Sequence, residues 1–308
     1  MKVSAFFPGQ GAQHPGMGQS VYENSAAAKK VFDCASEIAG QSVSDLCFSS
    51  SKEELSRTVN SQIAIFTCSM AALAALQERG VELDACAGFS LGEYTALTAA
   101  GVLTLEDGLR LVRRRGELMQ EAADSTDGCM AAVLGLADDM VEDICSRTEG
   151  LVLPVNYNCD GQLVIAGERT AVDLAAAACK EAGARRAMPL AVSGGFHTPL
   201  MAPAAAQLKE FAKSLTFSAP TMPLYTNVTG EILAVTDYPS YLEQHMVSPG
   251  TLEASGTSHD CRRTYRSHGD WRGQNPDQFL AQNFQRTDLQ NRGNYGKRHF
   301  CCGIKQTV

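Results

Sequence analysis

The sequence lacks the features that mark several classes of protein. It has no excess of positive charge, since 26 Lys and Arg residues stand against 34 Asp and Glu, which gives a net charge of −8. This balance argues against nucleic acid or an anionic membrane as the main partner. None of the 11 cysteines belongs to a Cys-x-x-Cys pair, so we expect reduced, mostly buried thiols in a cytoplasmic protein. A chain of 308 residues is also too long for a small disulfide scaffold.

The sequence also has little that would direct it into a membrane. We expect no stretch of the chain to be long and apolar enough to span a bilayer. The apolar stretch from Val3 to Phe7 is too short for the core of a signal peptide, and it is expected to form a first strand. Because 44% of the residues are hydrophobic and only 19% are charged, we expect one large domain with a smaller one inserted in it.

The most informative stretch is Gly88-Phe89-Ser90-Leu91-Gly92, a Gly-x-Ser-x-Gly pattern. A strand is expected over residues 85–89 and a helix over residues 91–100, so the serine falls on a sharp strand-to-helix turn. The two glycines leave room for the helix to fold back over the strand, and the turn directs the first N–H groups of the helix at whatever the serine attacks. A buried helix over residues 61–79 precedes the strand, and this α/β order predicts a parallel sheet of the hydrolase type.

A serine nucleophile needs a base, and only three histidines precede residue 250: His14, His197 and His245. His14 follows a flexible loop, and His245 is expected late on an amphipathic helix. His197 lies in the glycine-rich loop Ser193-Gly194-Gly195-Phe196 just before a helix start. We therefore expect His197 to be the base.

Four arginines lie on the helix expected from Thr104 to Ala122, namely Arg110, Arg113, Arg114 and Arg115. The last three are consecutive and point in directions about 100° apart. At least one should face inward, where a fixed guanidinium could hold a carboxylate with two hydrogen bonds. The others are expected on a solvated face.

The order of the expected helices and strands changes between residues 124 and 191. Residues 123–128 are expected to be a linker, followed by strand, helix, strand, strand, helix and strand, which is the ferredoxin-like plan. We therefore predict a discontinuous large domain of residues 1–123 and 192–249, with a small ferredoxin-like α+β subdomain of residues 124–191. A further core strand is expected over residues 221–227 and a helix over residues 236–246.

The last segment, residues 250–308, differs from the rest. Arg, Asn and Gln dominate it, and few Leu, Ile or Val residues could form a core. One hypothesis is a disordered polar tail, and another is translation out of frame.

Several motifs resemble those of the malonyl-CoA:acyl carrier protein transacylases of fatty-acid synthesis and of the related acyltransferase domains of polyketide synthases. The resemblance covers residues 3–249. It rests on motifs that occur in family order and spacing: residues 7–13 (FPGQGAQ), 88–94 (GFSLGEY), 115–120 (RGELMQ), 154–158 (PVNYN), 161–167 (GQLVIAG) and 196–201 (FHTPLM).

The resemblance implies malonyl transfer from malonyl-CoA to the phosphopantetheine thiol of acyl carrier protein, by a monomer with no cofactor and no metal. It implies that Ser90 is the acylated nucleophile, with His197 as its base, oriented by main-chain oxygens. The N–H groups of Gln10 and Leu91 would form the oxyanion hole, and Arg115 would bind the malonyl carboxylate. The other residues implied to bind substrate are Phe196, Met119 and Asn158.

The chain departs from this family in two places. Phe89 stands where the family usually has a histidine, so we expect an altered pocket polarity without loss of the reaction. The family segment that follows Pro249 and holds the histidine is not recognisable, so we expect His197 to be poorly oriented. Two other interpretations stay open: a serine esterase or thioesterase, and a non-catalytic remnant that binds carrier protein. The candidate basic residues for carrier binding are Arg113, Arg114, Lys180, Arg185 and Arg186.

Overall fold

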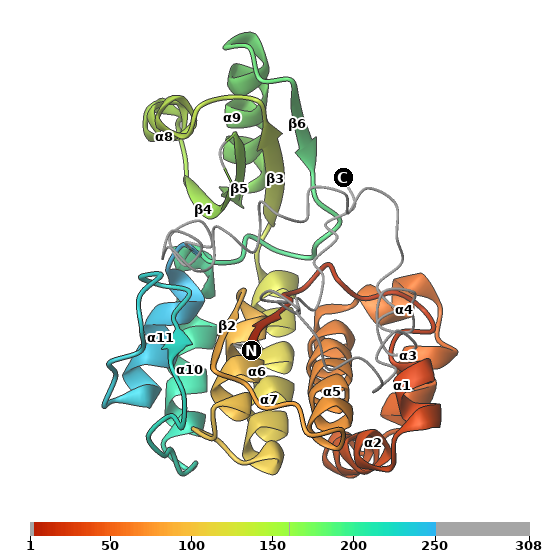
Figure 1. Ribbon diagram of the computed structural model, residues 1–308. Helices are drawn as coiled ribbons and strands as arrows, with labels where there is room; N and C mark the ends of the chain where they lie inside the picture. The colour runs from red at the N-terminus through yellow and green to blue at the C-terminus, as the bar shows by residue number, and fades with distance from the viewer. Residues whose placement is uncertain (1–2, 160, 251–308) are drawn as a thin grey trace, which may run out of the picture.

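The computed structural model describes residues 3–159 and 161–250. Within them the chain forms two separate sheets, a parallel one and an antiparallel one. Figure 1 shows the antiparallel sheet in an upper lobe, above a lower body of helices that surrounds the parallel sheet. The predictions for the tail lie outside the described residues, apart from Gly250.

The parallel sheet has the order β1-β2-β7. Its strands are β1 (Ser4–Phe7), β2 (Ala85–Gly88) and β7 (Leu224–Tyr225). Phe7 pairs with Gly88 in register, and Ala87 pairs with Tyr225. Because parallel strands end at the same edge, the loops that follow these three strands come together there.

The predicted strand over residues 221–227 is wrong in its length, because β7 spans only Leu224–Tyr225. The chain turns back on itself immediately afterwards, with Thr226 N–H donating to Glu231 O over 2.8 Å. This turn takes Asn227 out of the sheet and leaves it beside the end of β2.

Helices surround the parallel sheet. In Figure 1, α1 to α5 lie to the right of its strands, and α10 and α11 lie to the left. Those from the N-terminal part are α1 (Gln19–Asn24), α2 (Ala26–Ala39), α3 (Val43–Phe48), α4 (Lys52–Ser56), α5 (Thr58–Gln77), α6 (Leu91–Ala99) and α7 (Leu105–Ser125). Those from the C-terminal part are the short 3₁₀ turn η1 (Pro199–Met201), α10 (Ala202–Ala212) and α11 (Tyr238–Val247). Side chains cap two of these helices, since Ser25 Oγ accepts from Ala28 N–H and Thr104 Oγ1 accepts from Asp107 N–H.

Helix α5 is apolar on nearly all sides and is the central helix of the lower body. Its length and composition would allow it to cross a membrane, so the expectation that no stretch qualifies is wrong on those two criteria. However, 72% of that stretch is buried inside the protein, against α2, α6 and α7. A helix that is apolar all round is stable in water when neighbouring helices cover it, as they do here.

The antiparallel sheet has the order β4-β5-β3-β6. Its elements are β3 (Gly128–Leu134), α8 (Asp138–Arg147), β4 (Val152–Cys159), β5 (Gln162–Glu168), α9 (Arg169–Glu181) and β6 (Arg186–Pro189). Strand alternation gives β3 two buried faces. Ala131 and Val133 belong to a small core that includes residues of α8 and α9, whereas Met130 and Ala132 belong to the large core of the lower body.

The junction between the two lobes is shorter than the linker expected over residues 123–128. Helix α7 continues to Ser125, and β3 begins at Gly128. The helix is extended because Ala122 and Ala123 are buried in the core and Ser125 Oγ–H donates back to Ala122 O. The antiparallel sheet is therefore held close to the end of the helix that carries Arg115.

Candidate active site

Ser90 lies on the turn between β2 and α6, as the Gly-x-Ser-x-Gly pattern predicts. Its backbone has φ 51° and ψ −108°, which is strained for a residue with a side chain. A Cβ on Gly88 would lie 2.0 Å from the backbone of Gly92, and a Cβ on Gly92 would lie 2.0 Å from Phe7 O. Both glycines are therefore required for α6 to fold back over the strands.

His197 faces the serine. Its Nε2 lies 2.8 Å from Ser90 Oγ, and its Nδ1 lies 2.9 Å from Ser248 O. A carbonyl oxygen only accepts hydrogen bonds, so Nδ1 carries the proton and the Nε2 lone pair is left to accept from the serine hydroxyl. This is the geometry that a general base requires.

Burial lowers the pKa of His197 to about 3, and repulsion from His245 and from the Arg115 guanidinium contributes to this shift. The side chain is only 4% exposed. His197 is therefore neutral and able to accept a proton at physiological pH.

The expectation that His197 is poorly oriented is wrong in the described structure. Ser248 supplies the main-chain acceptor, and the chain after it is itself fixed. Gly250 N–H donates to Val155 O over 2.7 Å, and Tyr157 N–H donates to Gly250 O over 3.1 Å. Strand β4 of the upper sheet thus holds the segment that orients the histidine.

The other two candidate histidines are engaged elsewhere. His14 Nδ1 lies 3.1 Å from Pro15 O in its own loop. His245, on α11, is 1% exposed, and its Nε2 lies 3.2 Å from Glu93 Oε2. Of the three, His197 is the one whose ring nitrogen is hydrogen-bonded to Ser90.

Arg115 is the inward-facing arginine of α7 and is 1% exposed. It donates to Gln62 Oε1 over 2.7 Å and to Ser90 Oγ over 3.2 Å, and its guanidinium carbon lies 4.8 Å from the centre of the Tyr94 ring. Its Nε is buried without a hydrogen-bond partner among the described residues. Arg113 and Arg114 lie on the outer side of α7 and pair with Glu117.

Gln10 and Leu91 lie at the end of the parallel sheet. The loop that carries Gln10 follows β1 and is held next to the elbow, because Phe89 N–H donates to Phe7 O over 3.0 Å. Gln10 Nε2–H donates to Thr58 Oγ1 over 3.3 Å. Leu91 is the first residue of α6, where main-chain N–H groups have no partner within the helix.

The remaining predicted residues differ in how close they lie to Ser90. Phe196 is buried and precedes His197. Met119 shares a hydrogen-bond partner with Arg115, because Gln62 Nε2–H donates to Met119 Sδ over 3.2 Å and Gln62 Oε1 accepts from Arg115. Asn158 is half-buried near the end of β4.

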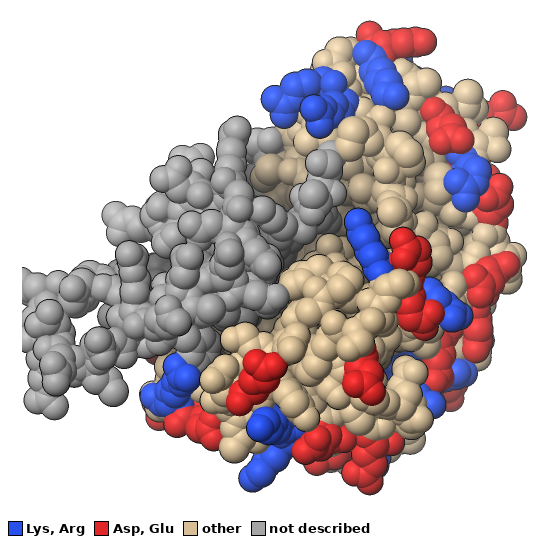
Figure 2. All heavy atoms as spheres, turned by 90° about the vertical axis from the view of Figure 1, so that its right-hand side faces the viewer, with Lys and Arg blue, Asp and Glu red and all other residues tan. Residues whose placement is uncertain are grey.

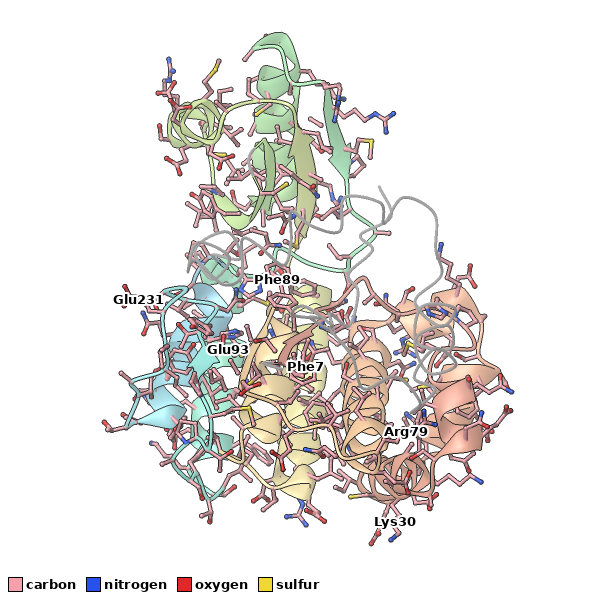
Figure 3. The ribbon with its side chains drawn as sticks, viewed as in Figure 1. Phe7, Lys30, Arg79, Phe89, Glu93 and Glu231 are labelled. Carbon is pink, nitrogen blue, oxygen red and sulfur yellow. The ribbon has the colours of Figure 1, made fainter. Side chains whose placement is uncertain are left out.

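Phe89 is buried beside the serine. Figure 3 shows it at the end of the lower body that faces the upper lobe, with Glu93 below it. A Cβ on Gly9 would lie 2.6 Å from Phe89 O, and one on Gly250 would lie 3.2 Å from the Phe89 ring. Phe89 therefore lies between the Gln10 loop and the segment after Ser248.

Sequence reasoning missed four residues of the site. They are Gln62, Glu93, Asn227 and Ser248. A signal existed for one of them, because Glu93 is the one charged residue of α6, whereas Gln62 is one of several polar residues on α5. Asn227 and Ser248 lie in irregular segments that carry no periodic pattern.

A strand-to-helix serine, a histidine on its hydroxyl and a buried arginine beside it define a serine acyltransferase or hydrolase. Comparison with known families narrows this class. Residues 6–257 match the acyl transferase domain, and the chain belongs to this family.

Individual relatives agree with the family. The chain is 42% identical over 258 residues to the malonyl CoA-acyl carrier protein transacylase of Bacillus subtilis, covering 82% of this chain and 81% of the relative. Among solved structures it is similar to the malonyl-CoA:acyl carrier protein transacylase of Xanthomonas oryzae, with 39% identity, 83% coverage of each chain and a TM-score of 0.78. It is also similar to a malonyl-transacylase solved in complex with a type II polyketide acyl carrier protein, with 37% identity, 82% and 83% coverage and a TM-score of 0.79.

Proposed function

We propose that this chain transfers the malonyl group from malonyl-CoA to the phosphopantetheine thiol of acyl carrier protein, through a malonyl-Ser90 intermediate. The observation that carries the proposal is the buried Arg115 guanidinium, 3.2 Å from the nucleophilic oxygen and with an unpartnered Nε. A buried cation is costly unless an anion pairs with it. An acyl group that ends in a carboxylate supplies that anion next to the reacting carbonyl.

The chemistry follows from the positions of the side chains. The Ser90 hydroxyl gives its proton to His197 Nε2 and attacks the thioester carbonyl, while the N–H groups of Gln10 and Leu91 bind the oxyanion. The C–S bond then breaks, His197 returns the proton to the CoA sulfur, and CoA leaves. The carrier thiol enters, gives its proton to His197 and attacks the malonyl-serine ester. The bond between the carbonyl carbon and Ser90 Oγ then breaks, and His197 returns the proton to Ser90 Oγ, which restores both residues.

Substrate binding also strengthens the base. The Arg115 charge is one of the causes that lower the pKa of His197. A malonyl carboxylate on Arg115 offsets that charge and so raises the pKa of His197 toward its ordinary value. Acetyl lacks the carboxylate, so it leaves the cation unpaired and the base weaker. The preference for malonyl should therefore appear in the chemical step as well as in binding.

The depressed pKa of His197 predicts an unusual pH dependence. The neutral base persists as pH falls below 6.5, so kcat/KM for enzyme acylation should stay level from pH 8 to about 5, because this parameter reports the free enzyme. Single-turnover acylation, measured by rapid quench across this range, checks the profile. A fall with an apparent pKa near that of free histidine would contradict the geometry proposed for the base.

The proposed transfer is tested against hydrolysis. With radiolabelled malonyl-CoA and phosphopantetheinylated carrier protein, we expect label on the carrier, ping-pong kinetics and little free malonate. Release of malonate as the main product would favour the esterase or thioesterase alternative. Absence of label on a folded enzyme would favour a remnant that only binds carrier protein. Arg115 argues against a simple esterase, which has no need of a buried carboxylate site.

We further propose that residues 1–123 and 192–249 form a hydrolase-like core domain and that residues 124–191 form an inserted ferredoxin-like subdomain. The strand order β6-β3-β5-β4, numbered within the subdomain as 4-1-3-2, supports this assignment. The two cores, one under α8 and α9 and one in the lower body, are a second support.

The acidic carrier protein needs a basic surface, and we propose the exposed side chains of Lys180, Arg185 and Arg186 for it. Figure 2 shows several Lys and Arg side chains close together on one side of the upper lobe, with Asp and Glu on the rest of that lobe and on the lower body. Arg113 and Arg114 are weaker candidates, because both pair with Glu117. We propose a cytoplasmic monomer that needs no cofactor or metal.

A further inference from the structure

Glu93 is a buried acid that the acyl-transfer steps above do not use. It lies in the first turn of α6, three residues after the nucleophile, and is 1% exposed. A carboxylate so deeply buried is costly unless several donors surround it. Its partners come from two other parts of the fold, the loop after β7 and helix α11.

The first contact leads to the nucleophile. Asn227 N–H donates to Glu93 Oε2 over 2.7 Å, and Asn227 Oδ1 accepts from Ser90 N–H over 2.8 Å. The serine backbone is strained, and such a conformation persists only when its surroundings fix it. Main-chain bonds fix the neighbours Phe89 and Gly92, whereas the serine N–H is held by the Asn227 side chain.

The second set of contacts leads to the base. Tyr241 O–H donates to Glu93 Oε1, and His245 Nε2 lies 3.2 Å from Glu93 Oε2. Both residues are on α11, which ends at Val247. The next residue, Ser248, supplies the carbonyl that accepts from His197 Nδ1. The same carboxylate is therefore bonded to the helix whose end orients the histidine.

We propose that Glu93 is a positioning residue that holds Ser90, through Asn227, and His197, through α11, in the relative placement that acyl transfer requires. The assignment rests on the function proposed above. Glu93 is hydrogen-bonded to none of the reacting atoms, and no hydrogen bond joins it to Arg115 or Gln62 among the described residues. Its loss should slow the chemical step and leave malonyl binding unchanged.

The test compares Glu93→Met with Glu93→Gln. Met has a similar size but only a weakly accepting sulfur, so it leaves the Asn227 N–H and the Tyr241 hydroxyl without a strong acceptor. Gln keeps a carbonyl oxygen for Asn227, and the Tyr241 hydroxyl can accept from its amide. Thr98→Val is the matched control, because Thr98 is buried on the same helix and its hydroxyl donates to Tyr94 O within that helix, away from Glu93 and Asn227. If the Met variant does not fold, Asn227→Ala separately tests the contact from Glu93 through Asn227 to Ser90.

Two rate constants are measured for each variant: single-turnover acylation of Ser90 at saturating malonyl-CoA, and phosphonylation of Ser90 by a small phosphonofluoridate. Neither depends on the amount of folded enzyme. We expect both to fall about 10- to 100-fold in Glu93→Met and in Asn227→Ala. We expect Glu93→Gln to recover most of the loss and Thr98→Val to match the unmodified enzyme. The dissociation constant for malonyl-CoA, measured with Ser90→Ala also present, should change by less than about 3-fold.

Wild-type rate constants in Glu93→Met and in Asn227→Ala, together with a lowered melting temperature, would overturn the proposal and leave Glu93 a purely structural residue. An equal loss in Glu93→Gln and Glu93→Met would overturn it as well, because the acceptor would then not matter. If the unmodified enzyme reacts with the phosphonofluoridate but not with malonyl-CoA, the proposed function fails, and the phosphonylation rates still decide the role of Glu93.

Discussion

Ser90→Ala is expected to abolish formation of the malonyl-enzyme while malonyl-CoA still binds. The substitution removes the only atom that forms the ester, and no other hydroxyl among the described residues is hydrogen-bonded to His197. It also frees one Arg115 N–H that the hydroxyl now occupies, so binding of the malonyl carboxylate should be equal or tighter. Intact-mass spectrometry after incubation with malonyl-CoA, with calorimetric binding in parallel, measures the two effects.

The matched control is Ser69→Ala, because Ser69 is a buried serine on α5. We expect it to be labelled as fully as the unmodified chain. Label that persists on Ser90→Ala would assign the nucleophile to another residue. Loss of both label and binding would indicate that the substitution had disturbed the fold, which thermal unfolding of the variant would reveal.

The elbow could be predicted from the sequence because its determinants are local. Gly88 and Gly92 lie within two residues of Ser90, and the helix must pass so close to Phe7 that a Cβ at Gly92 has no room. The inward arginine was predictable only in part. Helix geometry required that one of Arg113, Arg114 and Arg115 face inward, but the choice among them depended on resemblance to known transacylases.

The supports of the site were not predictable, because they join segments far apart in the chain. Ser90 and Asn227 are 137 residues apart, and His197 and Ser248 are 51 residues apart. Both Asn227 and Ser248 follow a strand or helix end in irregular structure, where no hydrophobic period marks their direction. Without Ser248 in view, the altered sequence after Pro249 suggested a loss of histidine orientation that the structure does not have.

In the two lobes, too, the features set by neighbouring residues were predictable, whereas the contact between distant segments was not. The alternation of β3 and the helical periods of α8 and α9 are visible in the sequence, so the order of elements was predicted well. The bridge from Gly250 to β4 was not, because a single main-chain pairing leaves no pattern in side chains. This bridge connects the upper sheet to the segment that orients His197, so the proposed base depends on how the two lobes are arranged.

Arg115→Ala is expected to remove the preference for malonyl over acetyl. On the proposed function, a malonyl carboxylate pairs with the buried Arg115 guanidinium, which donates to Gln62 Oε1 over 2.7 Å. Loss of one partner of such a buried charge pair costs about 3 kcal/mol, so kcat/KM for malonyl-CoA should fall on the order of 100-fold. With acetyl-CoA the same change removes a cation that the acyl group leaves unpaired, and one cause of the low His197 pKa, so kcat/KM should hold or rise.

The measurement is kcat/KM for both thioesters in each variant, with Arg110→Ala as the control. Arg110 is on the same helix, but its side chain is 57% exposed and pairs with Asp107, so its loss should leave both values unchanged. A fall of equal size with malonyl and acetyl would assign Arg115 to the stability of the site. A fall confined to malonyl would make the guanidinium the origin of selectivity, acting through carboxylate binding and through the basicity of His197.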